Sequence, residues 1–167
     1  MGDRTKIIND PADLVPLIYT FNDDKNTEIF RKLTEGEITE ESLKKEYGED
    51  AEKVLELLKS IGLVKSDWSM GSDGPVKEYK SSYSKFRANF ECNLEDIVEI
   101  LRISTCEGTI ENGLLDNGKE EVFKKACEEE KTISEISKET GIKEVLVRAV
   151  AKRSTSIFIK GNKIKVK

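Results

Sequence analysis

The sequence predicts an α+β protein that is mostly helical and contains two small domains. Apolar residues recur at helical spacings through most of the chain, and a glycine-containing hairpin pattern follows the helices in each half. Charged residues make up 37% of the 167 residues, which favours thin domains with large solvated faces. A glycine-rich, irregular stretch at residues 105–118 marks the boundary. The expected domains are therefore residues 1–104 and 105–167.

Helical patterns precede any strand signal in the first domain. The fourth pattern is the clearest, because Ala51, Val54, Leu55 and Leu58 recur at spacings of three and four before Gly62 ends the segment. The first pattern contains Pro16, which must lie in the first turn of its helix. The four expected helices lie within residues 11–21, 24–33, 38–48 and 49–62.

Strand signals follow these helices. Residues 63–69 and 76–84 flank "MGSDGP", a connection typical of a hairpin, and "FRANFEC" at residues 86–92 alternates apolar and polar residues. Asn93 is a candidate cap for a further helix over residues 94–103, whose apolar stripe contains Leu94, Ile97, Val98 and Leu101.

The second domain has a shorter and clearer pattern. A helix is expected over residues 119–130, and Thr132 with Glu135 forms a capping box that begins the next helix. Gly141 supplies a turn, residues 143–154 form a third helix, and "SIFIKGNKIKVK" predicts a hairpin with a Gly161–Asn162 loop. Helix, helix, helix, hairpin is the order of a winged helix.

Composition argues against several classes of protein. The chain has no histidine and three widely separated cysteines, Cys92, Cys106 and Cys127, so we expect neither a metal site nor any other cofactor. No nucleophile motif or phosphate-binding glycine loop is present, which makes an enzyme improbable. No long apolar segment or signal sequence is visible, and we expect a cytoplasmic protein without a membrane span.

Charge is distributed unevenly along the sequence. Residues 131–167 contain ten basic and three acidic residues, whereas residues 1–130 contain 18 basic and 30 acidic residues. A basic segment of this kind indicates an anionic partner for the C-terminal domain.

Residues 11–104 resemble the winged helix-turn-helix of ArsR-type regulators, especially archaeal members. The similar segments are "NDDKNTEIFRKL", "LLKSIGLV" and "GPVKEYKSSYSKF", and "TISEISKETGIKEVLVRAV" independently resembles the general helix-turn-helix pattern. The resemblance implies tandem winged-helix domains, a DNA-binding transcriptional regulator and a homodimer. Two departures limit it: residues 1–91 contain no cysteine for the metal site of the family, and the first recognition segment is short and begins with acidic residues.

We therefore expect the C-terminal helix-turn-helix and hairpin to make most contacts with duplex DNA. A basic helix in the major groove, with a basic wing along the phosphates, matches this spacing. The candidate contacts are Lys138, Lys143, Leu146, Arg148, Lys152, Arg153, Lys160, Lys163 and Lys165.

The first helix and the helix after Asn93 offer apolar surface for a homodimer. The candidate interface residues are Leu14, Leu17, Ile18, Ile97, Val98 and Leu101. The alternative function is a non-enzymatic adapter that binds proteins in a transcription or chromosome complex, which the acidic first domain would suit. RNA binding by the basic domain is a third possibility that no recognisable stacking motif supports.

Overall fold

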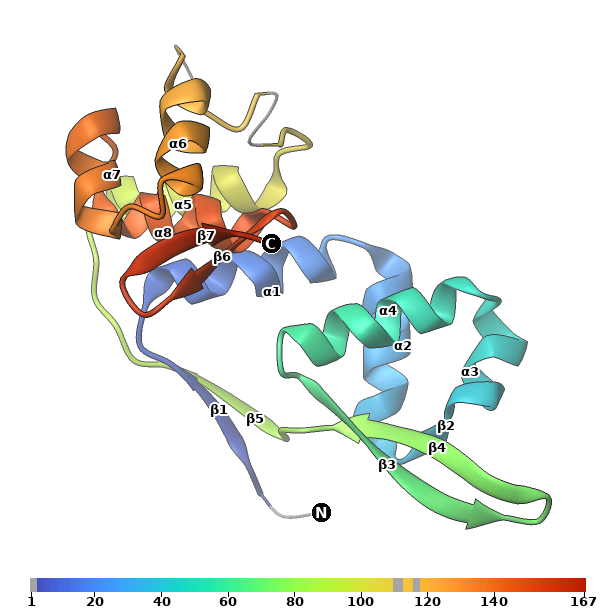
Figure 1. Cartoon of the computed structure of the whole chain (residues 1–167). Coiled ribbons are helices and arrows are strands. Elements are labelled where there is room, and N and C mark those ends of the chain that lie inside the picture. Colours follow the sequence, from blue (N-terminus) through green and yellow to red (C-terminus); the bar gives the residue numbers. More distant parts are fainter. Residues whose placement is uncertain (1–2, 110–112, 116–117) are drawn as a thin grey trace. The chain divides into compact units, whose positions relative to one another are not determined.

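The structure of the protein, a computed structural model, describes residues 3–109, 113–115 and 118–167 (Figure 1). The chain divides into two compact units and crosses between them three times. Unit 1 comprises residues 1–7 and 20–88, and unit 2 comprises residues 8–19 and 89–167. Both units mix helices and strands, as the α+β prediction requires.

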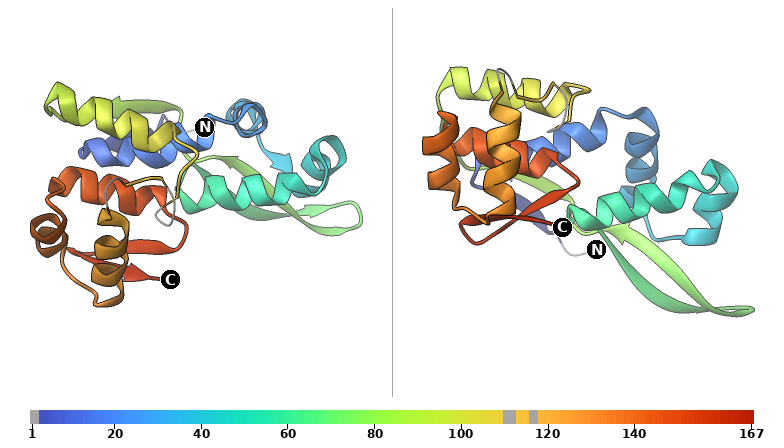
Figure 2. Two further views of the ribbon diagram at one scale, coloured as in Figure 1. Left: turned by 90° about the horizontal axis from the view of Figure 1, so that it is seen from above. Right: turned by 45° about the horizontal axis from the view of Figure 1, so that its top comes forward.

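Unit 1 combines a helical layer with a small antiparallel sheet. Its sheet has the strand order β2, β4, β3, and Ser66 lies opposite Tyr79 in the β3–β4 hairpin. Figures 1 and 2 show this hairpin as a long ribbon that projects from the helices of the unit. The elements are α2 (Asp24–Glu35), β2 (Ile38–Thr39), α3 (Glu40–Tyr47), α4 (Asp50–Ser60), β3 (Val64–Gly71) and β4 (Gly74–Ser81), with β1 (Thr5–Ile8) paired to β5 (Lys85–Ala88).

Local sequence explains where the helices of unit 1 begin and end. The Asp23 side chain accepts a hydrogen bond from the Asn26 amide at 3.0 Å, and the Thr39 hydroxyl accepts one from the Ser42 amide at 3.2 Å. Gly48, with φ of 75°, ends α3 in a conformation that favours glycine, and α4 begins two residues later. The core beneath these helices consists of Ile29, Leu33, Leu43, Ala51, Val54, Leu55, Leu58, Leu63, Val64 and Tyr79.

Unit 2 is built around α8 (Glu144–Arg153). The helices α5 and α7, the short 3-10 helix η1 and the strand β6 all pack against it. The order helix, helix, helix, hairpin predicted for the C-terminal block is confirmed. The other elements are η1 (Pro11–Asp13), α1 (Leu14–Phe21), α5 (Leu94–Thr105), α6 (Lys119–Glu128), α7 (Ile133–Thr140), β6 (Ile157–Lys160) and β7 (Lys163–Val166).

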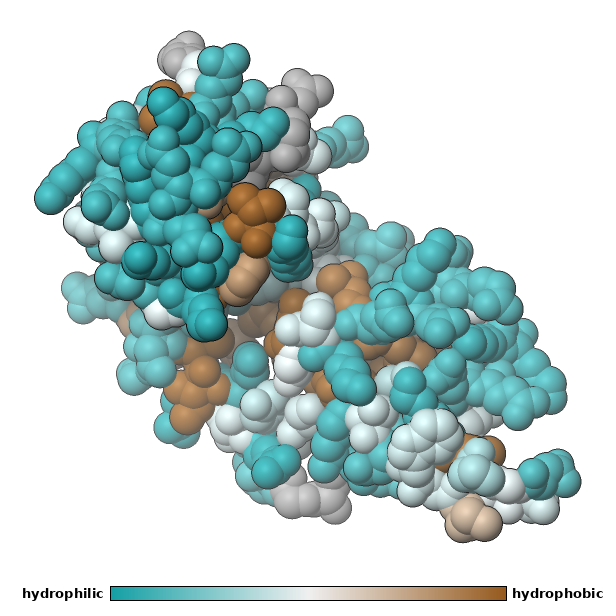
Figure 3. All heavy atoms as spheres, in the orientation of Figure 1, coloured by the Kyte–Doolittle hydropathy of each residue, from teal (hydrophilic) through white to brown (hydrophobic). Residues whose placement is uncertain are grey.

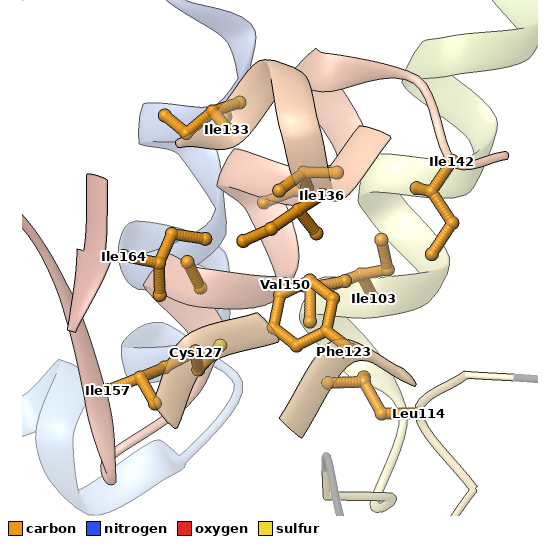
Figure 4. Close-up of a cluster of buried hydrophobic side chains, with 14 of the residues drawn as sticks. Ile103, Leu114, Phe123, Cys127, Ile133, Ile136, Ile142, Val150, Ile157 and Ile164 are labelled. Atoms are coloured by element: carbon orange, nitrogen blue, oxygen red, sulfur yellow. The ribbon is translucent and has the colours of Figure 1, made fainter. Parts of the chain in front are cut away.

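One apolar cluster holds unit 2 together (Figure 4). Phe123, Ile136 and Val150 are completely buried in it, and Ala12 and Val15 from the N-terminal segment belong to the same cluster. The predicted capping box of α7 is present: the Thr132 hydroxyl accepts from the Glu135 amide at 3.2 Å, and the Glu135 carboxylate accepts from the Thr132 amide at 2.8 Å.

Two expectations differ from the structure. The units divide at residues 7, 19 and 88 and not at residue 105, because α5 and residues 8–19 pack with the C-terminal elements. The strand expected over residues 86–92 is limited to β5, and its inward face is not buried: Phe86 is 53% exposed. Alternation in the sequence predicted burial there, but no layer covers β5 sufficiently to bury Phe86.

Among the described residues, no helix combines the length and the apolar character that crossing a membrane requires.

Candidate nucleic-acid interface

Two of the three cationic side chains of α8, and that of Lys143 before it, are held by carboxylates of unit 2. The Lys143 Nζ atom lies 2.6 Å from Asp96 Oδ1, and the Arg148 Nε atom lies 2.6 Å from Asp10 Oδ2. Lys152 forms a third ion pair, with Asp13. Three of the cations predicted to meet DNA phosphates therefore already have an anionic partner within the same unit.

The carboxylates are positioned by local structure. Asp10 caps η1, because its side chain accepts a hydrogen bond from the Ala12 amide at 2.9 Å, and Pro11 occupies the first position of that helix. Asp96 lies in the first turn of α5 and is only 6% exposed. Because η1 and α5 pack directly on α8, these acids meet its basic side chains.

The hydrogen bond from Lys143 to Asp96 raises the pKa of the Lys143 ammonium against a smaller opposing effect of burial. Charge in the folded units is also more even than in the sequence halves. Unit 1 contains 14 basic and 16 acidic residues, and unit 2 contains 14 basic and 17 acidic residues. The basic charge of residues 131–167 is therefore balanced by acidic residues within unit 2. Unit 2 is not the more basic of the two units.

The remaining predicted contacts of α8 and the hairpin fall into two groups. Leu146 is half-buried against the apolar cluster, Arg153 stacks on the Tyr19 ring, and Lys165 pairs with Glu130 at 2.8 Å. The exposed group consists of Lys138 on α7 and of Lys160 and Lys163 at the hairpin turn. The structure thus does not bring the nine candidate side chains together on one open surface.

The helix α4 of unit 1 has an open outward face. Its inward residues are buried, whereas Glu49, Glu52, Lys53, Glu56 and Lys59 are exposed. Some of the acids on this side are paired with lysines of the same unit, since Lys25 lies 3.0 Å from Asp50 and Lys44 lies 2.9 Å from Glu52. The face is therefore less repulsive to a polyanion than its sequence suggests.

Two apolar side chains are exposed near the end of the β3–β4 hairpin, which lies next to α4. Trp68 is 71% exposed and Met70 is 82% exposed. In Figure 3 the end of this hairpin, at the lower right, combines pale, brown and teal atoms, whereas the helices of the same unit are mostly teal. An exposed aromatic and an exposed thioether at this position indicate a contact surface.

Comparison with protein families decides the general class. A profile described as ArsR transcriptional regulator matches residues 8–167, which includes most of both units. The chain belongs to this family. Membership indicates a DNA-binding transcriptional regulator, and regulators of this kind are typically not enzymes. A comparison with curated protein sequences found no match.

The expected dimer residues of this ArsR-family chain lie on α1 and α5, and residues 8–19 and all of α5 belong to unit 2. Leu14, Leu17, Ile18 and Ile97 are half-buried, whereas Val98 is 60% exposed and Leu101 is 45% exposed. Leu94 is 79% exposed, although it was not among the candidate interface residues. With Val98 and Leu101 it forms a stripe at spacings of four and three, a signal that the sequence contained.

Cysteine placement bears on the metal chemistry of an ArsR-family chain. Cys92 and Cys106 are half-buried, Cys127 is buried, and all three are free thiols. Burial raises the pKa of the Cys127 thiol to about 11. In the part of the chain that the structure describes, no cluster of acidic, cysteine or histidine side chains is arranged to hold a metal ion.

Sequence reasoning missed the acidic partners of α8. Asp10 and Asp13 precede Arg148 and Lys152 by about 140 positions, and no local spacing connects them. The available signal was the pair of acids around Pro11 in "NDPAD", which reads equally well as the start of a helix.

Proposed function

We propose that this ArsR-family chain is an archaeal cytoplasmic regulator with tandem winged-helix units, and that it binds duplex DNA as a homodimer mainly through unit 1. The choice of unit 1 rests on a difference in exposure between the two candidate recognition helices, α4 and α8. The outward face of α4 is exposed, whereas of residues 143–153 only Lys143 and Glu144 are exposed. A helix must present a free face to enter the major groove.

Unit 1 supplies the parts that such a contact needs. Lys53 and Lys59 project from α4, and Lys45 is exposed on α3. The exposed glutamates of α4 suit cytosine amino groups, which donate hydrogen bonds to carboxylates in the major groove. The β3–β4 hairpin follows α4 in the chain, as a wing follows the recognition helix of a winged helix, and would extend the contact to the adjacent groove.

Charge predicts how this binding responds to salt. If the three lysines neutralise about three phosphates for each chain of the dimer, log affinity falls against log salt with a slope of roughly −2.7 per chain. The three exposed cations of the C-terminal surface, Lys138, Lys160 and Lys163, would give the same slope. A filter-binding or anisotropy series from low to moderate salt on the chain's own upstream DNA therefore measures the number of phosphates neutralised, and variants must distinguish the two surfaces.

Matched double variants of the full chain test the assignment. Lys53→Gln with Lys59→Gln removes two exposed cations from α4, and Lys160→Gln with Lys163→Gln removes two from the C-terminal hairpin. We expect the first variant to weaken DNA binding about tenfold or more and to reduce the salt slope by about two, while the second changes little. The reverse result assigns the contact to the C-terminal hairpin, where the exposed Lys138, Lys160 and Lys163 favour it.

Dimerisation is proposed through the exposed stripe of α5 together with α1. Val98→Glu with Leu101→Glu places charges on this stripe without touching the buried Ile100 and Ile103. We expect a folded monomer by sedimentation and a loss of tight DNA binding. A wild-type protein that sediments as a monomer at micromolar concentration contradicts the dimer.

The adapter alternative is favoured by one observation, the exposed Trp68 and Met70 of the hairpin. Aromatic residues and methionine are enriched in protein interfaces. Trp68→Ala with Met70→Ala should weaken DNA binding if the hairpin acts as a wing. Unchanged DNA affinity, together with loss of a stoichiometric protein partner, supports the adapter.

A further inference from the structure

Arg153 differs from the other cations of the α8 segment in having no acidic partner. Lys143, Arg148 and Lys152 each meet an aspartate. Within the described part of the chain, Arg153 forms no ion pair, and its Nε atom is buried without a hydrogen-bond acceptor. A buried donor of a charged group that has no acceptor is costly, so its position calls for an explanation.

The guanidinium group of Arg153 is held by its neighbours in one orientation. Its central carbon lies 3.7 Å from the centre of the Tyr19 ring, a stacked cation–π geometry. The Nη2 atom donates a hydrogen bond to the Cys106 carbonyl oxygen at 3.1 Å. These contacts fix the plane of the group but leave most of its five N–H donors unused.

The same side chain lines a pocket of about 230 Å³. The pocket lies where α8 ends and the chain turns toward β6, and hydroxyl-bearing residues surround it: Thr109, Ser154, Thr155, Ser156 and Tyr19. The hydroxyls of Ser154 and Ser156 lie 3.0 Å apart, and the Ser154 hydroxyl accepts from the Ser156 amide at 3.1 Å, which orders this turn. No hydrogen bond within the described residues uses the hydroxyls of Thr155, Thr109 or Tyr19.

We propose that this pocket binds a small oxyanion, with the Arg153 guanidinium as its charge partner and the hydroxyl of Thr155 as a further donor. A guanidinium fork matches the oxygens of phosphate or carboxylate, and hydroxyls at its side complete the shell of donors. Tetrahedral inorganic phosphate is the first candidate. The site is separate from the surface proposed for DNA, and it shares α1 with the proposed dimer surface, because Tyr19 follows Ile18 on that helix.

Two features of the pocket limit the affinity. Glu107 lines it and is exposed, so its carboxylate opposes an anion. The pocket also lies at the C-terminal end of α8, where the helix dipole presents partial negative charge. The expected dissociation constant is therefore weak, on the order of 1 mM. Removing the Glu107 charge should strengthen binding about two- to fivefold.

Calorimetric titration of the full chain with inorganic phosphate, at constant ionic strength and pH 7, tests the proposal. We expect saturable binding at one site per chain. Arg153→Gln should weaken it roughly tenfold or more, and Thr155→Val, a change at an exposed position, about threefold. Lys138→Gln removes an exposed cation outside the pocket and serves as the matched control, with affinity unchanged.

Each outcome of the phosphate titration either supports or overturns the proposed site. Saturable binding that weakens in Arg153→Gln and strengthens in Glu107→Gln supports the site. Absence of saturable binding by the folded wild-type chain overturns it, as does binding that folded Arg153→Gln retains. If Arg153→Gln does not fold, unchanged affinity in Thr155→Val and Glu107→Gln overturns it instead.

A second titration identifies the source of the anion. Acetate in place of phosphate shows whether a carboxylate is accepted, and the wild-type chain saturated with phosphate is then titrated with duplex DNA. If phosphate leaves DNA affinity unchanged at constant ionic strength, the pocket takes a free anion. If phosphate competes with DNA and Arg153→Gln removes the competition, the oxyanion is a backbone phosphate, and the free-anion site is overturned while the DNA contact of unit 1 remains testable by its own variants.

Discussion

Arg148 tests whether α8 is an internal support or a reading helix. We expect Arg148→Gln and Asp10→Asn to destabilise the protein by coupled amounts, because their side chains form an ion pair at 2.6 Å that is only 28% and 27% exposed. Asn at position 10 retains an oxygen for the Ala12 amide, so Asp10→Asn removes the charge and keeps the cap.

The magnitude follows from the partial burial of the pair. Unit charges about 4 Å apart attract by about 1 kcal/mol in water and about 4 kcal/mol near a protein surface, before desolvation and side-chain ordering are subtracted. Exposed pairs retain about 0.2–1 kcal/mol, whereas breaking a buried pair costs about 3–5 kcal/mol. For this half-buried pair we expect each single change to lower the free energy of unfolding by about 2 kcal/mol and the double change to lower it by about 2.5 kcal/mol. The coupling energy is then about 1.5 kcal/mol.

Urea unfolding followed by circular dichroism measures these free energies, with Lys160→Gln as an exposed-cation control that should change stability by less than about 0.5 kcal/mol. The coupling should decrease at about 1 M salt, because the pair is partly solvated. Additive effects within about 0.5 kcal/mol would refute the reasoning. If Arg148→Gln leaves stability unchanged and alters the DNA sequence preference, α8 is the recognition helix.

Other changes test particular parts of unit 2. Gly141 has φ of 70° and open space around its α-carbon, so Gly141→Ala should cost about 1 kcal/mol in urea unfolding from backbone conformation alone. Cys127, with its pKa raised to about 11, should resist iodoacetamide at pH 8 until urea unfolds the protein, and mass spectrometry should find Cys92 and Cys106 modified first. The hydrogen bond from the Thr132 amide lowers the pKa of Glu135 in the folded protein. The ionised carboxylate therefore stabilises the fold above its unfolded pKa, and this stabilisation is lost as the pH falls through the folded pKa. The urea midpoints of Glu135→Gln and of the wild type should differ at pH 7 and converge in acid.

Local signals predicted the elements of this fold well. The capping box at Thr132, the turn at Gly141 and the Gly161–Asn162 hairpin are all present, because each depends on residues a few positions apart. Family resemblance was also detectable from short segments, and the match to residues 8–167 confirms the ArsR family.

Interactions between distant segments could not be predicted in the same way. Counting charges along the chain separated the basic C-terminus from Asp10, Asp13 and Asp96, although folding brings them together. Apolar periodicity on α5 predicted one stripe of Leu94, Ile97, Val98 and Leu101, but only the packed structure shows that Val98 is exposed and that Ile100, outside the predicted stripe, is buried. Periodicity alone cannot say which neighbour covers which part of a wide stripe.

The composition of unit 2 from residues 8–19 and 89–167 has a consequence for synthesis on the ribosome. Residues 20–88 can collapse on themselves as soon as they emerge, whereas Ala12 and Val15 must wait for Val150 and Ile164 at the far end of the chain. Until then residues 8–19 are an unpaired apolar stretch. Emergence of residues 150–164 from the ribosome is therefore the event that allows residues 8–19 to find their place, and a chain truncated before residue 150 leaves them exposed to proteases.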